Sequence, residues 1–317
     1  MDETRLVERL AAIGWKGDAR VELGPGDDAA VLIGGLVVST DMTVEGVHFS
    51  FEWIAPAEAG FRAAAAALSD MAAMGAVPEA LLVSLALPAE DPALGEELQR
   101  GARAAGDRTG APIVGGDVSR SPGPVVIDVV ALGRAAPDVV TRSGARPGHH
   151  LWVSGALGGA AAAVAAWSRG MRPEPEARAR FVRPPDRTRL GTALAGQGLA
   201  TSMIDVSDGL LADAWRLARA SEAGIRVLEH RVPVDEMAGG DLNHALEGGE
   251  DYELMFTAHP GAKSGILALG RELSVQLTRI GSVGEGAGVL LEDAEGRRGV
   301  PGRGGFDHFA ASSGDPP

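Results

Sequence analysis

The feature that most restricts the possible folds is an apolar run that ends in aspartate, which recurs along the chain. The clearest cases are Gly26-Asp27-Asp28, Ser39-Thr40-Asp41, Gly115-Gly116-Asp117 and Asp205-Val206-Ser207-Asp208. Aspartate is a poor strand former and costs free energy when it is buried without a partner. We therefore expect these carboxylates at strand ends that meet in one cleft, where they and nearby hydroxyl oxygens suit Mg²⁺. Taken singly, each is better explained as a turn after a strand, but the set favours a metal site.

Asp70 is the sharpest single case. It lies in or near the end of the Ala-rich segment 56–74, which has the composition of a helix that stops at Gly75. A carboxylate near a helix C-terminus opposes the helix dipole by about 0.3–1 kcal/mol. A solvated helix face is the alternative, but this unfavourable position favours a functional role.

Both halves of the chain mix predicted helices with predicted strands, which indicates two α+β domains. In the first half, we expect strands at 36–40, 80–87, 112–114 and 125–132, and helices at 56–74 and 94–108. In the second half, we expect strands at 151–154, 202–206, 226–230, 252–258 and 276–283, and helices at 159–169 and 210–221. The polar segment 142–150 contains Gly and Pro and predicts a junction. We therefore place the two domains at residues 1–140 and 141–317.

Charge and composition exclude several classes of function. The 317 residues carry a formal charge of −14 and include no cysteine, which excludes disulfides, cysteine-ligated metals and cysteine nucleophiles. Lysine occurs only as Lys16 and Lys263, so the chain has little affinity for nucleic acids or anionic membranes. Residues 1–10 do not suit a signal peptide, and no stretch is apolar enough to span a bilayer. We expect a cytoplasmic protein that binds a polyphosphate only with the help of cations.

Several common nucleotide-binding and hydrolase motifs are missing from the sequence. There is no GxxxxGK[ST] loop and no HRD or DFG set, which argues against P-loop enzymes and protein kinases. The segment 24–29 resembles a dinucleotide fingerprint, but another apolar run follows it instead of a helix. Neither GxSxG nor HExxH occurs, so a covalent serine hydrolase and a zinc protease have no support.

Eight segments, read in order, resemble the thiamine-monophosphate kinase family. They are GPGDDAAV (24–31), STDMTVEGVHF (39–49), LSDMAAMGAVP (68–78), GGD (115–117), TRSGARPG (141–148), IDVSDGL (204–210), GGEDYEL (248–254) and GFDHF (305–309). Each segment alone is weakly specific. Eight of them in the family's order, covering nearly the whole chain, are strongly specific.

This resemblance implies a fold and a set of ligands. The family belongs to the aminoimidazole ribonucleotide synthetase-like (PurM-like) superfamily, in which an N-terminal α+β domain dimerises through its sheet and a second α+β domain follows. A homodimer that binds ATP, thiamine monophosphate and several Mg²⁺ ions is therefore implied. The residues implied around the metal ions are Asp28, Ser39, Thr40, Asp41, Asp70, Asp117, Asp205 and Asp208. The implied ATP contacts are Gly116, Asp117, Arg142 and Ser207, and the implied thiamine-phosphate contacts are His48, Glu250 and Phe306.

The chemistry of such an acceptor agrees with the resemblance. Phosphoryl transfer needs alignment and charge neutralisation more than a nucleophilic side chain, and a phosphate acceptor is already ionised near pH 7. We therefore expect direct in-line transfer without a phosphoenzyme and assign no covalent nucleophile. Glu250 would pair with the cationic ring of thiamine, and Phe306 would stack on it. Structural explanations stay open: a strand end for His48, a strand start for Glu250, a salt bridge for Arg142 and a core position for Phe306.

Two other functions compete with a thiamine-phosphate kinase. One is another ATP-using superfamily member, such as aminoimidazole ribonucleotide synthetase, although GGEDYEL and VEGVHF argue against it. The other is a non-catalytic nucleotide-binding regulator. Such a regulator would keep the aspartates on the ATP side without needing His48 and Glu250.

Overall fold

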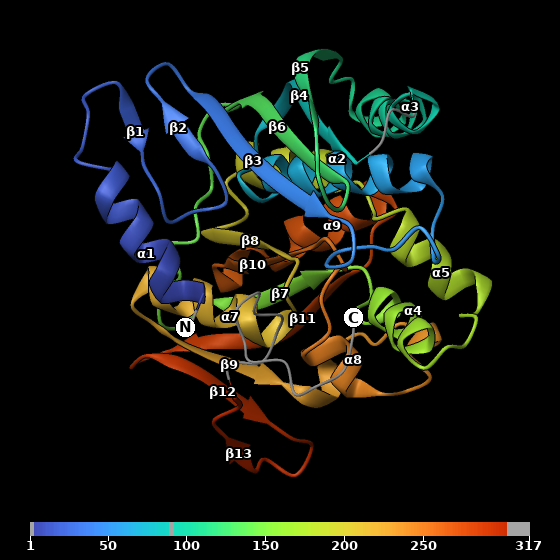
Figure 1. Cartoon of the computed structure of the whole chain (residues 1–317). Helices are drawn as coiled ribbons and strands as arrows, with labels where there is room; N and C mark the ends of the chain where they lie inside the picture. The colour runs from blue at the N-terminus through green and yellow to red at the C-terminus, as the bar shows by residue number, and fades with distance from the viewer. Residues whose placement is uncertain (1–2, 89–91, 303–317) are drawn as a thin grey trace.

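The computed structural model describes residues 3–88 and 92–302, which form two α+β halves (Figure 1). The first half contains α1 (Glu3–Gly14), β1 (Val21–Leu23), β2 (Ala30–Leu32), β3 (Leu36–Val44), α2 (Pro56–Ala73), β4 (Val77–Leu87), α3 (Pro92–Thr109), β5 (Ile113–Arg120) and β6 (Val126–Arg134). The second half contains β7 (His150–Ser154), α4 (Gly159–Ser168), α5 (Pro175–Val182), α6 (Thr188–Gly196), β8 (Ser202–Val206), α7 (Leu210–Ser221), β9 (Gly224–Leu228), α8 (Leu242–Leu246), β10 (Glu253–Ala258), α9 (Lys263–Leu273), β11 (Leu277–Gly284), β12 (Gly288–Glu292) and β13 (Arg298–Gly299).

The first half is built on a six-stranded sheet in the order β1-β2-β3-β6-β4-β5, in which only β4 and β5 pair in parallel. Alternate residues of a strand point to opposite faces of the sheet. On one face, residues such as Val37, Val83 and Val129 are buried in a core that includes α2 and α3. On the other face, side chains are partly or largely exposed, and Met42 is 58% exposed. The sheet therefore has one covered and one open face.

Helix α2 begins and ends where its sequence requires. Pro56 opens the first turn, and the Glu58 carboxylate accepts a 2.9 Å hydrogen bond from the Ala55 N–H. The helix stops at Gly75, which has a φ of +65°, a conformation that glycine adopts without steric cost. Gly60 lets the backbone of α3 approach closely, because a Cβ there would lie 1.9 Å from the Leu98 carbonyl oxygen. At its other end, α2 packs through Ala72 and Ala73 against the second half, so it lies between the two halves.

The second half is a seven-stranded sheet in the order β13-β12-β9-β11-β7-β10-β8. Helix α7 packs on one face with Ile204 and Val206 of β8. Helices α6 and α9, together with the end of α2, pack on the other face with Met203. Both faces are covered, so every residue of β8 and β10 is buried. The alternation along β8 turns Asp205 toward the α2 side, as Met203 is.

The sequence predicted the α+β class correctly, and the predicted strands and helices lie close to observed ones. The strand expected at 112–114 is longer and runs to Arg120, because Gly115 and Gly116 do not interrupt its pairing with β4. Helices α1, α6, α8 and α9 and the short strands β1, β2, β12 and β13 were not predicted. Residues 135–149 lie between the two sheets, and the boundary at 140/141 stays a prediction. Within the described residues, no helix combines the length and apolar character that a membrane crossing requires.

Candidate active site

Three buried or half-buried aspartates from distant parts of the chain meet between the two sheets. Asp28 precedes β2, Asp70 lies in the last turn of α2, and Asp205 lies on β8. One carboxylate oxygen from each lies within 4.8 Å of the others. Asp28 and Asp205 are 9% and 4% exposed. We call these three residues the acid cluster; it joins the first half of the chain to the second.

Serine hydroxyls surround the acid cluster. The Ser39 hydroxyl on β3 donates a hydrogen bond to Asp70 Oδ2. The Ser69 hydroxyl on α2 donates to Asp205 Oδ2 at 2.7 Å, and the Ser207 hydroxyl donates to Asp205 Oδ1 at 3.4 Å. These bonds orient the carboxylates, but neutral hydroxyls do not compensate three negative charges.

The pKa values indicate that the acid cluster has too little positive charge around it. Burial, followed by the charges of Asp205, Asp28 and Asp41, raises the pKa of Asp70 well above its usual range. Burial and then Asp28 likewise raise the pKa of Asp205 well above its usual range. Carboxylates this close cannot all ionise near pH 7 unless a cation joins them.

Arg142 is the cation that touches the acid cluster. Its Nη2 lies 2.7 Å from Asp28 Oδ1, and its backbone N–H donates to both carboxylate oxygens of Asp27 at 3.2 and 3.1 Å. Burial, and next the charge of Asp28, raise the pKa of Asp27 to about 6. Asp28 Oδ2 is buried and has no hydrogen-bond partner. One Asp28 oxygen is therefore compensated by Arg142, and the other is left for a further ligand.

Asp41 links the acid cluster to Glu250. It lies on β3, two residues after Ser39 and on the same face of the sheet. Burial, followed by the charges of Glu250, Asp128 and Asp208, raises the pKa of Asp41 to about 7. Glu250 follows a turn after α8 and forms a 2.7 Å ion pair with Arg62 of α2. Asp41 thus has acidic neighbours from both halves of the chain.

His48 lies in the turn that follows β3. Its Nδ1 accepts a 3.0 Å hydrogen bond from the Val44 N–H. In the neutral imidazole the proton is therefore on Nε2. Fixing one ring nitrogen on the backbone sets the direction in which the other nitrogen points.

Comparison with known proteins identifies the family. Residues 26–135 match the family described as AIR synthase related protein, N-terminal domain, and residues 146–293 match the corresponding C-terminal domain. The thiamine-monophosphate kinase of Mycobacterium tuberculosis (strain CDC 1551 / Oshkosh) is 39% identical over 289 residues, which cover 86% of this chain and 85% of that protein. The thiamine-monophosphate kinase of Escherichia coli (strain K12) is 36% identical over 310 residues, covering 92% and 93%.

The chain belongs to the thiamine-monophosphate kinase family.

A solved structure of this family, AaThiL complexed with AMPPCP and TMP, has the same fold. Its TM-score is 0.84 at 30% sequence identity, and the likeness covers 97% of each chain. The two-domain fold expected from the resemblance is thus confirmed for this thiamine-monophosphate kinase family member.

The structure does not bring all the predicted site residues of the family together. Thr40 and Asp117 lie on the open face of the first sheet, where the Thr40 hydroxyl donates to Asp128 Oδ1 at 2.9 Å. Asp117 is exposed on the edge strand β5, three strands from β3, which is roughly 14 Å at the usual strand spacing. Gly116 packs so closely on β4 that a Cβ would lie 1.8 Å from the Val83 carbonyl oxygen. The metal and ATP roles of these residues stay predictions.

Asp208 is held by a pair of residues that the sequence analysis missed. Arg216 forms ion pairs with both Asp208 and Asp213. Asp213 is fully buried and accepts hydrogen bonds from the N–H groups of Ser207 and Asp208 at 3.1 and 3.2 Å. The available signal was Asp213, an acidic residue among apolar neighbours in the first turn of α7, followed three residues later by Arg216. Phe306 lies outside the described residues, so its stacking role stays a prediction.

The acid cluster suits a divalent cation. Its donors are carboxylate and hydroxyl oxygens, which are the ligands that Mg²⁺ prefers. The buried Asp28 Oδ2 without a partner and the raised pKa values of Asp70 and Asp205 both indicate missing positive charge. The residues present therefore fit Mg²⁺.

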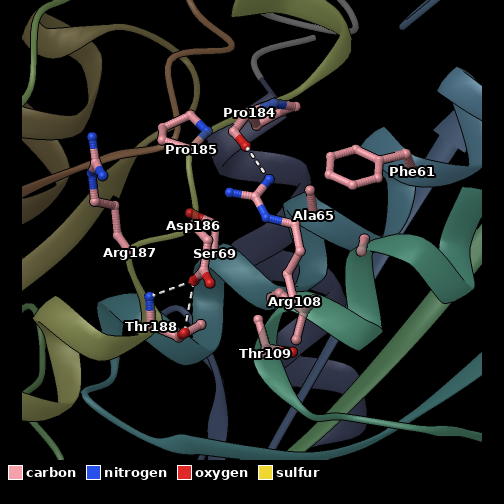
Figure 2. Close-up of a pocket in the computed structure, with 12 residues that line it drawn as sticks. Phe61, Ala65, Ser69, Arg108, Thr109, Pro184, Pro185, Asp186, Arg187 and Thr188 are labelled. Atoms are coloured by element: carbon pink, nitrogen blue, oxygen red, sulfur yellow. Dashed lines mark hydrogen bonds between the residues drawn. The ribbon is translucent and has the colours of Figure 1, made fainter.

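A separate cavity lies behind α2, between α3 and the segment that leads into α6 (Figure 2). Its lining includes Phe61, Ser69, Arg108 and Asp186. Arg108 donates to the Pro184 carbonyl at 3.4 Å, and Asp186 accepts hydrogen bonds from Thr188. These polar groups have partners already, so we assign no ligand to the cavity.

Proposed function

We propose that this chain is a thiamine-monophosphate kinase, which transfers the γ-phosphoryl group of ATP to the phosphate of thiamine monophosphate and releases thiamine diphosphate and ADP. The observation that carries the proposal is the acid cluster, which is built from both halves of a chain of this family. Since the family complex contains AMPPCP and TMP, a nucleotide and a phosphorylated acceptor are the expected ligands.

Mg²⁺ is the proposed cofactor, held by Asp28, Asp70 and Asp205, with Asp41 close enough to act on Asp70. When bound, it would neutralise phosphate oxygens on two mutually repelling anions. The chain has only two lysines and a net charge of −14, so a bound cation would add to the few positive charges available for this at the site. The further metal roles of Ser39, Thr40, Asp117 and Asp208 are part of the same proposal.

On the nucleotide side, we propose that Arg142 and Ser207 contact ATP, with Gly116 and Asp117 as additional contacts. Arg142 is already anchored by Asp27 and Asp28, so little side-chain freedom is lost when it meets a phosphate. On the acceptor side, we propose His48, Glu250 and Phe306. The acceptor phosphate is ionised near pH 7, so the reaction needs no strong base and proceeds by direct in-line attack.

We also propose a homodimer in which the open faces of two first sheets meet. Half-exposed apolar side chains such as Leu82, Val130 and Leu132 line this face, which is unusual for a sheet that meets water. We further propose a cytoplasmic location, where ATP and Mg²⁺ are both abundant.

A product assay tests the function directly. The purified protein is incubated with ATP, Mg²⁺ and thiamine monophosphate, and the products are separated by chromatography. Equal amounts of thiamine diphosphate and ADP are expected. ADP formed without thiamine diphosphate would indicate a different acceptor, and nucleotide binding without turnover would indicate a regulator.

A further inference from the structure

Arg62 is a buried cation that pairs with Glu250 at the edge of the candidate site. It lies on α2 and is 4% exposed. Its Nη2 forms the 2.7 Å ion pair with Glu250, and its Nη1 donates to the Phe181 carbonyl oxygen. A charge this deeply buried needs partners, and these two come from the second half of the chain.

An aromatic stack holds the guanidinium group of Arg62 in place. The Cζ atom of Arg62 lies 3.6 Å from the centre of the Phe181 ring. Phe181 meets Trp167 edge-on at 5.1 Å, and Trp167 stacks on Trp53 at 5.2 Å with an angle of 3° between the rings. Trp53 precedes α2, Trp167 lies on α4 and Phe181 lies on α5. The stack therefore spans both halves and leaves Arg62 little freedom to move.

The segment that carries Glu250 is unusual in its backbone. Glu250 and Tyr252 have φ angles of +73° and +49°, in a region that residues with side chains rarely adopt. The buried carboxylate of Asp251, between them, accepts hydrogen bonds from the Gly158 N–H at 2.9 and 3.0 Å. Such conformations persist only where the surroundings hold them, and they gather at functional sites.

The surroundings of Glu250 are acidic, which makes Arg62 necessary. Glu250 acts on Asp41 as a repelling charge, and Arg62 acts on the same group as an attracting one. Without Arg62, the Glu250 carboxylate would face Asp41 with no compensating charge. Its side chain would then move away or be less available to a cationic ligand.

We propose that Arg62 is a positioning residue for the acceptor: it holds the Glu250 carboxylate in the orientation that receives the cationic ring of thiamine monophosphate. This inference rests on the proposed function and adds a residue to it. Arg62 acts through Glu250 and does not touch the substrate, because its side chain is almost fully buried and its terminal nitrogens already bind protein oxygens.

The test compares four variants by steady-state kinetics and calorimetry with thiamine monophosphate. They are Arg62→Met, Arg62→Lys, Glu250→Gln and the double variant Arg62→Met/Glu250→Gln. Arg62→Met should lower kcat/KM for thiamine monophosphate by at least about tenfold while the KM for ATP stays within about twofold. Arg62→Lys keeps the positive charge but not the planar guanidinium group, so kcat/KM for thiamine monophosphate should fall less than in Arg62→Met. It also carries the test if Arg62→Met does not fold.

A control variant is available one turn away on α2. Glu58 forms a bidentate ion pair with Arg178 of α5 at 2.8 and 2.5 Å, so Glu58→Gln also breaks a charged contact between α2 and α5. It leaves Glu250 untouched. Glu58→Gln should change the melting temperature of the protein, but it should not selectively lower kcat/KM for thiamine monophosphate. A selective loss in Glu58→Gln equal to that in Arg62→Met would overturn the proposal.

The double variant decides the question. If Arg62 works through Glu250, the double variant should be within about twofold of Glu250→Gln alone. Losses that multiply would show that Arg62 acts independently, and a parallel rise in both KM values would show a general structural role; either result overturns the proposal. A wild-type protein that binds thiamine monophosphate without phosphorylating it would refute the proposed function alone, and the calorimetric affinities would still test Arg62.

Discussion

Replacing Asp205 by asparagine should stabilise the metal-free protein and abolish its activity. Two unit charges 4.8 Å apart, the largest separation within the acid cluster, repel by about 3 kcal/mol at an effective dielectric constant of 20. Proton uptake and Arg142 relieve part of this repulsion in the wild type. We therefore expect a gain of about 1–2 kcal/mol, which corresponds to a rise of about 2–6 °C in Tm. The asparagine oxygen can still accept the Ser69 hydrogen bond, so little packing is lost.

The assay is thermal unfolding at pH 8, with EDTA or with excess Mg²⁺. Wild-type protein should gain stability from Mg²⁺, because an ion that binds only the folded state stabilises it. Asp205→Asn should start from a higher Tm in EDTA, gain much less from Mg²⁺ and lose at least about 10²-fold in turnover. Asp107→Asn makes the same chemical change at an exposed carboxylate on α3 and should leave all three quantities unchanged.

One outcome would refute this reasoning. If Asp205→Asn lowers the Tm in EDTA while Mg²⁺ stabilises it as much as the wild type, the acid cluster is not a site of uncompensated charge. The proposed metal site would then be wrong, although the family assignment would stand.

Two further predictions concern the buried carboxylates, and a third concerns the open face of the first sheet. The pKa values of Asp41 and Asp213 are raised to about 7, chiefly by burial, so the folded chain binds more protons than the unfolded chain between about pH 4 and 7. Stability falls as pH rises through that window; the Tm in EDTA should be higher at pH 6 than at pH 8, and an equal or lower Tm at pH 6 would contradict this. Asp41→Ala should reduce turnover by at least about 10²-fold in a folded protein, measured by thiamine diphosphate formation, and near-normal turnover would place the metal elsewhere. Val130→Lys puts a charge in the middle of the open sheet face and should convert the proposed dimer to a monomer in light scattering, whereas an unchanged mass would show that this face is not the interface.

Local sequence patterns picked out the three aspartates that the structure brings together. Aspartate at the end of apolar runs marked Asp28 and Asp205, and aspartate in an Ala-rich helix marked Asp70. These patterns are local, since each depends on a residue type that is unfavourable where it stands. The missed helices α6 and α9 contain glycine and few strong start signals, and packing against the second sheet stabilises them.

The open face of the first sheet shows a limit of pattern reading. Ser39, Thr40 and Asp41 are consecutive, and the sequence treated them as one group. In the strand β3 they alternate, so that Ser39 and Asp41 face α2 while Thr40 faces away. Only the strand pairing places Asp117 on the open face as well, far from Asp28 along the sheet.

By itself, the sequence determined the α+β class and the family, because residue type and order along the chain are enough for these. Tertiary structure alone decided which carboxylates share a charge deficit, since that depends on distances between residues that are far apart in the sequence. It also decided that Glu250 is paired with Arg62. The partners lie 188 positions apart, and no local pattern links a helix interior to a turn at that separation.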